Sequence, residues 1–114
     1  MTQSRTVAVI TPAFRAEDTL ATTVASVLAQ THADWQHWII ADDGADYAAF
    51  LDARGLRDER QIFVSSGGLG TGASRTRNVA LDRLGTPYVA ILDADDRLKP
   101  KKLELAVAAL KTHA

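Results

Sequence analysis

The chain of 114 residues contains no cysteine, which excludes a disulfide scaffold, a zinc–thiolate site and a cysteine nucleophile. Neither sign of charge predominates, because 13 Lys and Arg oppose 14 Asp and Glu, so no nucleic-acid partner is indicated. No apolar run approaches the length of about 20 residues that crosses a bilayer, and no apolar signal-peptide core follows the first residues. A hydrophobic content of 46% argues against disorder. We therefore expect one soluble, cytoplasmic domain over residues 1–114.

Short apolar segments alternate with segments of helical spacing. Strands are predicted at 6–11, 36–41, 61–65 and 87–92, and helices at 17–30, 46–54, 73–84 and from about Pro100 to the end. Strand–helix alternation with short connections predicts an α/β fold, a Rossmann-like parallel sheet with helices on both faces. We expect the strand order 3-2-1-4. Right-handed crossovers place every strand-to-helix loop at the carboxyl edge of the sheet, where such sheets bind ligands.

The loops after the first two predicted strands contain an aromatic and an acidic group. Pro12 stiffens the exit from the first strand, and Phe14 follows it. Phe14 is interpreted either as a core anchor for the next helix or as a flat face for a nucleobase. Asp42 and Asp43 follow the second strand, and Asp46 is placed to cap a helix. Turn formation accounts for Asp46 and for Asp42, which leaves Asp43 free to accept a hydrogen bond from a base or a sugar.

The loop after the third strand is rich in glycine, with four of the seven glycines between Gly67 and Gly72. Glycine lets backbone N–H groups approach an anion at a helix start. The pattern is neither a Walker loop nor a clean G-x-G-x-x-G, so a plain loop explains it equally well. Arg75 and Arg77 follow, either as solvated helix charges or as groups that reach a diphosphate.

The loop after the fourth strand carries Asp93, Asp95 and Asp96. Side chains alternate along an extended segment, so Asp93 and Asp95 are expected to point to the same side. Two convergent carboxylates suit a hard cation such as Mg²⁺ or Mn²⁺. A capped turn is the alternative, although it uses fewer acidic residues than stand here.

The histidines show no metal-ligand spacing. His37 is expected to face outward beside a buried Trp38, and Trp35 and Trp38 are expected to pack rather than bind. There is no G-x-S-x-G motif, and no Ser-His-Asp set is indicated.

Five motifs in register resemble the inverting family-two glycosyltransferases of GT-A fold. They cover nearly the whole chain, which makes the match specific although each motif alone is weak. The matching segments are Val7 to Phe14, Ser26 to Thr31, Ile40 to Gly44, Gly72 to Asn78, and Tyr88 to Asp96 with Pro100.

The resemblance implies roles for four residues at the nucleotide. Pro12 and Phe14 would line the nucleobase pocket, with Phe14 as the stacking aromatic. Asp43 would accept a hydrogen bond from the base, and Arg77 would help to organise the nucleotide site. UDP is the nucleotide that the resemblance favours.

The resemblance also implies a metal site, because Asp93-Ala94-Asp95 matches the family's Asp-X-Asp motif. Asp93 would face the ribose or the sugar and contribute to the metal site, and Asp95 would hold Mn²⁺ or Mg²⁺ through the diphosphate. Two positions depart from the family: Arg15 stands where Asn is common, and Gly70 replaces a frequent Asn. These departures affect the contacts of the base and of the glycine-rich loop.

The implied reaction is inverting transfer of a sugar from a nucleotide diphosphate to the hydroxyl of a glycan, lipid or small-molecule acceptor. In the family, the general base and most of the acceptor site lie beyond the position of residue 114. The chain is therefore expected to be the nucleotide-binding half of a catalytic domain, in the cytoplasm or at the cytoplasmic face of a membrane. We expect it to bind nucleotide, to transfer sugar poorly or not at all, and to form homo-oligomers through an exposed sheet edge.

Other functions compete with this one. A nucleotidyltransferase also uses a parallel sheet, a metal and acidic loops. It usually has a glycine-rich basic loop after the first strand, which the segment from Thr11 to Phe14 does not supply. A receiver-like signalling module needs its acidic pair after the first strand, and the order here is different. A non-catalytic nucleotide-binding module of the same fold is also compatible with the sequence, because no general base is visible in it.

Overall fold

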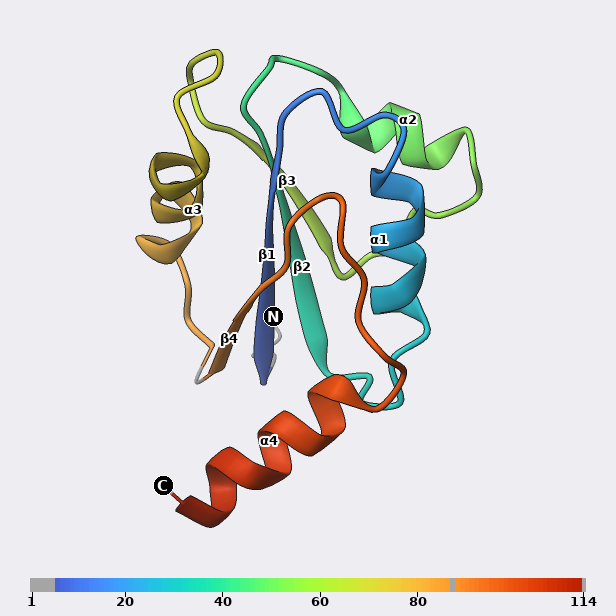
Figure 1. Ribbon diagram of the computed structural model, residues 1–114, viewed down its shortest axis with the longest axis vertical. Helices are drawn as coiled ribbons and strands as arrows, with labels where there is room; N and C mark the ends of the chain where they lie inside the picture. The colour runs from blue at the N-terminus through green and yellow to red at the C-terminus, as the bar shows by residue number, and fades with distance from the viewer. Residues whose placement is uncertain (1–5, 87, 114) are drawn as a thin grey trace.

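A computed structural model describes residues 6–86 and 88–113 (Figure 1). Its elements in chain order are β1 (Val7–Ala13), α1 (Leu20–Leu28), β2 (Trp35–Ala41), α2 (Tyr47–Asp52), β3 (Gln61–Ser65), α3 (Ala73–Leu81), β4 (Tyr88–Ile91) and α4 (Lys102–His113). The four strands form one sheet in the order β3-β2-β1-β4, and each neighbouring pair is parallel. The predicted fold class and strand order are confirmed.

Helices cover both faces of the sheet, as predicted. Helix α3 lies on one side of the strands, and α1 and α2 lie on the other (Figure 1). The strand period of two explains the division: Ala8 and Ile10 of β1 pack with Ala80 of α3, whereas Val9 packs with Val27 of α1. Helix α4 joins the second group through Leu103 and Val107.

Strand β1 is longer than the sequence predicts, because it continues through Pro12 to Ala13. Proline lacks an N–H donor and is tolerated where no strand needs that donor. The carbonyl of Ile10 accepts a hydrogen bond from Leu92 N, so the backbone groups of alternate residues face β4. Strand β4 pairs with β1 only as far as Ile10, so the nitrogen of Pro12 faces the side of β4 beyond the last paired residue, where no strand requires a donor.

Strand β4 is shorter and more exposed than the buried strand predicted at 87–92. It spans Tyr88–Ile91, and Pro87 lies outside the described residues. The side chains of Val89 and Ile91 are 44% and 46% exposed, because β4 is the last strand in the sheet order and α3 does not extend over it.

The helices are shorter than predicted at several ends. Helix α1 begins at Leu20, and Thr19 occupies its N-cap without a side-chain capping bond. Asp46 does cap α2, accepting a hydrogen bond from Ala49 N at 3.0 Å. Helix α3 ends at Leu81, ahead of the predicted end near Gly85. Helix α4 begins at Lys102, two residues after the predicted start near Pro100. No helix among the described residues is long and apolar enough to cross a membrane.

The expectation that His37 faces outward is wrong. His37 is fully buried, and its Nε2 lies 2.7 Å from Thr11 Oγ1 on the neighbouring strand. Strand β2 is covered on both faces, so the alternate residues Trp35, His37 and Ile39 are buried on one side, while Trp38 and Ile40 are buried on the other. Burial lowers the pKa of His37 to about 3, so the imidazole is neutral at pH 7.

Candidate active site

A cavity of about 360 Å³ opens at the carboxyl edge of the sheet. All four strand-to-helix loops, or the residues next to them, contribute to this carboxyl-edge cavity. Its lining residues are Pro12, Ala13, Phe14, Asp42, Gly70, Gly72, Thr76 and Asp93. The parallel sheet explains why side chains so far apart in the sequence meet, because every strand ends at the same edge.

Phe14 is the aromatic side chain of this cavity, and 45% of it is exposed. That exposure disfavours the interpretation of Phe14 as a core anchor. The glycine-rich loop lies against the edge of its ring: a Cβ on Gly70 would stand 3.5 Å from Phe14 Cε1. Gly70 also has a φ of +63°, and this left-handed backbone conformation favours glycine, whereas the distance to Phe14 is an ordinary van der Waals contact. The guanidinium of Arg15 lies 5.1 Å from the ring centroid.

Asp42 holds the glycine-rich loop in place. Its carboxylate accepts hydrogen bonds from Ser66 Oγ at 2.6 Å, Thr71 Oγ1 at 2.7 Å and Gly72 N at 3.1 Å. Its backbone carbonyl accepts a fourth from Gly70 N at 2.7 Å. Burial raises the pKa of Asp42, but these hydrogen bonds outweigh burial and hold that pKa well below its ordinary value. The N–H of Gly72 is therefore committed to a carboxylate of the protein, which argues against a free anion-binding loop.

Asp43 is not free, in contrast to the sequence interpretation. Its Oδ2 accepts from Arg15 N at 2.6 Å and from Tyr47 Oη at 2.7 Å, and its Oδ1 accepts from Ala45 N at 3.0 Å. Tyr47 Oη in turn accepts from Ala16 N at 3.1 Å. Burial raises the pKa of Asp43, but the lowering by these hydrogen bonds is the larger effect. The net pKa is below its ordinary value, so the group is ionised at pH 7. The side chain joins the loop after β1 to the start of α2.

Arg77 lies on α3 but does not line the carboxyl-edge cavity. Its Nη2 donates to Ser74 Oγ at 3.2 Å, one turn earlier on the helix. Thr76, the preceding residue, is the one that α3 directs toward the cavity, where it is fully buried. The hydroxyl of Thr76 donates to Gly72 O at 2.8 Å and so joins the helix to the glycine-rich loop.

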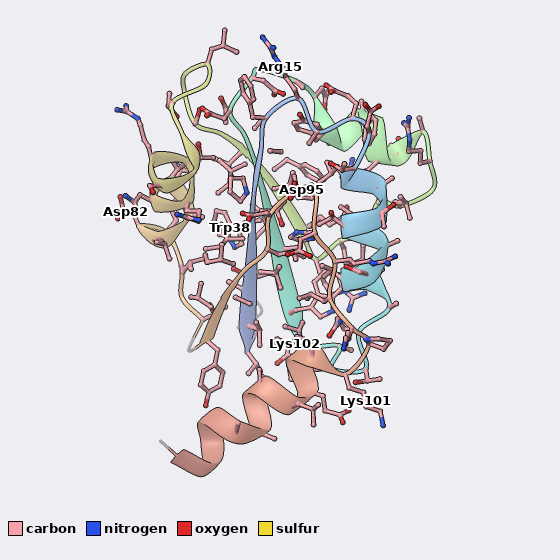
Figure 2. The ribbon with its side chains drawn as sticks, viewed as in Figure 1. Arg15, Trp38, Asp82, Asp95, Lys101 and Lys102 are labelled. Carbon is pink, nitrogen blue, oxygen red and sulfur yellow. The ribbon has the colours of Figure 1, made fainter. Side chains whose placement is uncertain are left out.

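The segment after β4 is not extended, so the argument from side-chain alternation is wrong. It forms a turn in which Asp96 N donates to Asp93 O at 3.0 Å. Asp93 lines the carboxyl-edge cavity, whereas Asp95 borders a neighbouring cavity of about 370 Å³ with Asp18, Thr19 and other residues of the α1 start. Figure 2 shows Arg15 at the carboxyl edge and Asp95 on the loop that runs from β4 toward α1.

The turn supplies two carboxylates, Asp93 and Asp95, which border different cavities. Asp93 and Asp95 are both exposed, and within the described residues no group of three or more potential metal-binding side chains occurs. A permanent site built only from protein side chains needs more donors than this. Mg²⁺ and similar hard cations are commonly held by one or two carboxylates together with the phosphates of a substrate, and that donor set agrees with the residues present.

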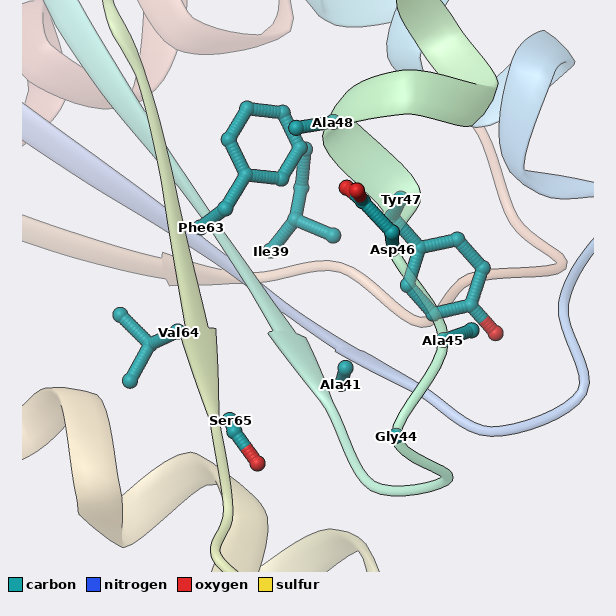
Figure 3. Close-up of a pocket in the computed structure, with 10 residues that line it drawn as sticks. All are labelled: Ile39, Ala41, Gly44, Ala45, Asp46, Tyr47, Ala48, Phe63, Val64 and Ser65. Atoms are coloured by element: carbon teal, nitrogen blue, oxygen red, sulfur yellow. The ribbon is translucent and has the colours of Figure 1, made fainter.

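A further cavity of about 240 Å³ lies between α2 and β3 (Figure 3). Ile39, Tyr47 and Phe63 form much of its wall. Asp46 is its one charged lining residue and already caps α2. This cavity therefore offers less polar chemistry than the carboxyl-edge cavity.

The sequence reasoning missed three residues that shape the site: Asp42, Tyr47 and Thr76. Asp42 is 3% exposed, and three hydrogen-bond donors surround its carboxylate. The serine and threonine residues of the glycine-rich loop were the available signal, since hydroxyl groups are natural donors to a carboxylate. Tyr47 carries no comparable signal, because its role depends on the approach of the loop after β1.

Solved structures of similar fold belong to longer proteins. A crystal structure of residues 1–349 of TarS from S. aureus in complex with UDP-GlcNAc superposes with a TM-score of 0.83 at 20% identity, covering 95% of this chain and 32% of that one. Mannosyltransferase PcManGT from Pyrobaculum calidifontis, in complex with GDP-Man and Mn²⁺, has a TM-score of 0.71 at 18% identity, with 95% and 32% covered. At these identities the likeness establishes the fold.

Curated relatives are closer in sequence. The chain is 39% identical over 98 residues to the putative teichuronic acid biosynthesis glycosyltransferase TuaG of Bacillus subtilis, covering 86% of this chain and 39% of that protein. It is 33% identical over 104 residues to the UDP-Glc:alpha-D-GlcNAc-diphosphoundecaprenol beta-1,3-glucosyltransferase WfgD of Escherichia coli, covering 91% and 40%. The chain thus spans about two fifths of the length of these relatives. The model of the family described as glycosyl transferase family 2 matches residues 8–114, and the chain belongs to that family.

Proposed function

We propose that this chain binds a nucleotide-diphosphate sugar at its carboxyl edge and forms the donor-binding part of an inverting glycosyltransferase. One observation carries the proposal: an exposed aromatic ring, Phe14, and an acidic side chain, Asp93, line the same cavity of about 360 Å³ although 79 positions separate them. A nucleoside diphosphate needs an apolar face for its base and an acidic or metal-binding group near its phosphates. This cavity supplies both.

The nucleoside would occupy the side of the cavity formed by Pro12 and Phe14. A base gains about 1–3 kcal/mol by stacking on an aromatic ring. Asp43 retains acceptor capacity for a base N–H, because each carboxylate oxygen has two lone pairs and Oδ1 accepts one hydrogen bond here. Arg77 would reach the nucleotide by exchanging its contact with Ser74 for one with the ligand.

The diphosphate would lie toward the turn after β4. Asp93 and Asp95 would hold Mn²⁺ or Mg²⁺ together with the phosphate oxygens. The bound cation would neutralise the negative charge that develops on the departing diphosphate. Asp93 would also face the ribose or the sugar, because it already lines the cavity next to Phe14.

The reaction would form a bond between an acceptor oxygen and the anomeric carbon, and break the bond from that carbon to the diphosphate oxygen. Attack from the opposite face inverts the configuration, and a carboxylate base takes the acceptor proton. We propose that this base and most of the acceptor site belong to the part of such a protein that the chain does not span. The acceptor would be a glycan, a lipid or a small molecule with a free hydroxyl.

UDP is the nucleotide that we propose. WfgD is named for a UDP-Glc donor, and TarS has been crystallised with UDP and with UDP-GlcNAc. The GDP-Man complex of PcManGT makes GDP the alternative to compare.

Titration calorimetry with UDP, GDP and dTDP, with and without Mn²⁺, tests this proposal. We expect UDP to bind most tightly, and Mn²⁺ to raise its affinity by about tenfold or more, which corresponds to about 1.4 kcal/mol. Asp95→Ala should abolish that gain. Asp82→Ala is the matched control, because Asp82 is an exposed carboxylate at the C-cap of α3, away from the turn (Figure 2). Binding of UDP that is identical with and without Mn²⁺ would refute the metal site, and no binding of any nucleotide would refute the function.

We also propose that the chain self-associates through β4. The exposed side chains of Val89 and Ile91 lie on the last strand of the sheet. An open strand edge next to apolar side chains favours pairing with a second copy of the chain.

A further inference from the structure

The polar side of α1 contacts the segment that carries the acidic turn. Thr23, Ser26 and Gln30 lie on or directly after α1, spaced so that they share one side of the helix. Each makes hydrogen bonds to backbone groups between Ala94 and Leu103, about 70 positions further along the chain. The apolar residues of the same helix, Leu20, Val24 and Val27, are buried in the core.

Thr23 contacts the backbone on both sides of Asp95. Its hydroxyl is fully buried and lies within hydrogen-bond distance of Ala94 O, at 2.8 Å, and of Asp96 O. The single hydroxyl hydrogen is shared between these two carbonyls and the more distant Thr19 O, at 3.4 Å. Because the carbonyls of Ala94 and Asp96 flank Asp95, the contact fixes the backbone from which the Asp95 side chain projects.

Ser26 and Gln30 hold the continuation of the segment. Ser26 Oγ accepts from Leu98 N at 3.0 Å and donates to Thr23 O at 2.7 Å. Gln30 Nε2 donates to Lys99 O at 2.7 Å, and its Oε1 accepts from Leu103 N at 3.0 Å. Residues 92–101 form neither helix nor strand, so these side chains supply the partners that regular structure would otherwise supply.

We infer that Thr23 and Ser26 are positioning residues for the cation site: they hold the turn at 93–96 so that Asp95 meets a divalent cation and a diphosphate together. This inference rests on the proposed function, because it assumes that Asp95 binds a cation. It goes further by assigning the geometry of that site to a helix whose side chains do not bind the cation themselves. If the turn were not held in place, ordering it on binding would cost entropy and weaken the affinity for the ligand.

Thr23→Val tests the inference, because valine keeps the shape of threonine and removes the hydroxyl. We expect the Mn²⁺-dependent gain in UDP affinity to fall by about threefold or more, within the range of couplings carried by packed networks. The affinity measured in EDTA should stay within about twofold of the unsubstituted chain. Thr23→Ser, which keeps the hydroxyl, should restore the gain. Ser26→Ala is a second variant with the same expected direction, and it applies if Thr23→Val fails to fold.

Thr86→Val is the matched control. Thr86 Oγ1 donates to Tyr88 O at 3.1 Å, so the substitution removes the same kind of bond at the amino end of β4, away from the turn. Hydrogen exchange gives a readout that needs no ligand: the amides of 95–98 should exchange faster in Thr23→Val than in Thr86→Val.

The outcomes separate the inference from the proposed function. If the unsubstituted chain fails to bind UDP, or binds it without any effect of Mn²⁺, the proposed function or its metal site fails and the inference fails with it. If the unsubstituted chain shows the Mn²⁺ gain and both Thr23→Val and Ser26→Ala keep it, only the inference is overturned. An equal loss of affinity with Mn²⁺ and in EDTA would also overturn it, since that pattern indicates general destabilisation.

Discussion

The hydroxyl of Tyr47 donates a hydrogen bond of 2.7 Å to Asp43 while it accepts one of 3.1 Å from Ala16 N. The tyrosine thus connects the first residues after β1 with the acidic loop after β2. Burial, together with the hydrogen bond to Asp43, raises the pKa of Tyr47 to about 12. The hydroxyl therefore stays protonated, and remains a donor, throughout the neutral range.

Tyr47→Phe should lower the free energy of unfolding by about 1–2 kcal/mol, because it leaves Ala16 N buried without an acceptor. UDP affinity should also fall several-fold, since Asp43 loses a hydrogen bond that orients it. Urea unfolding and calorimetry measure the two effects. Tyr88→Phe is the control, because no side-chain hydrogen bond of Tyr88 is found among the described residues. Equal stability and equal affinity in Tyr47→Phe would contradict the role of the hydroxyl.

Phe14→Ala should weaken UDP binding by about 1–3 kcal/mol, the usual contribution of a base stacked on an aromatic ring. Because the ring is 45% exposed, its removal should change the free energy of unfolding little. Phe14→Tyr, which keeps the ring, should bind normally. The expectation would be wrong if Phe14→Ala retained full affinity, or if it unfolded the chain.

The buried His37 predicts a stability that depends on pH. Its pKa is lowered to about 3 in the folded chain, against about 6.5 in an unfolded one. Below pH 6.5 the unfolded state therefore binds a proton that the folded state does not, and stability falls as the pH falls. The loss from this group is about 1.6 kcal/mol between pH 6.5 and 5. In His37→Gln, the free energy of unfolding measured with denaturant should change less with pH over this interval. A pH dependence equal to that of the unsubstituted chain would contradict the assignment.

Self-association through β4 predicts a mass that grows with concentration in light scattering. Val89→Lys should return the chain to monomers, because a charge on the exposed strand opposes pairing. Leu105→Lys is the control, since Leu105 is 62% exposed on α4. A monomer mass at every concentration of the unsubstituted chain would rule out this association.

The arrangement of the sheet could be predicted from sequence because each strand is a compact apolar run between turn residues. The same patterns did not predict that β1 continues through Pro12, because that depends on its pairing with β2 as far as Ala41. They also misplaced His37, since a polar residue in a strand covered on both faces has no exposed side to occupy. Local pattern predicts elements, whereas these details depend on partners distant in the sequence.

The candidate site was predicted in part for a related reason. Phe14 and Asp93 were expected at the carboxyl edge, and the structure places both in one cavity. The turn at 93–96 and the hydrogen bonds of Asp43 were not expected, because both depend on contacts with α1 and with the loop after β1. The spacing of residues in one sequence shows which side chains lie in the loops at the carboxyl edge. It does not show which of them form hydrogen bonds with other parts of the protein.

Strand β4 stops opposite Ile10 while β1 continues for three more residues. The carboxyl edge of the sheet is therefore uneven, and the acidic turn begins where the shorter strand β4 ends. Lengthening β4 by two residues would carry these aspartates outward by roughly 7 Å, at about 3.3 Å per residue. If the proposed diphosphate binds at this turn, its depth above the sheet would be set by the difference in length of two adjacent strands, and altering that difference would move the site without changing a cation-binding residue.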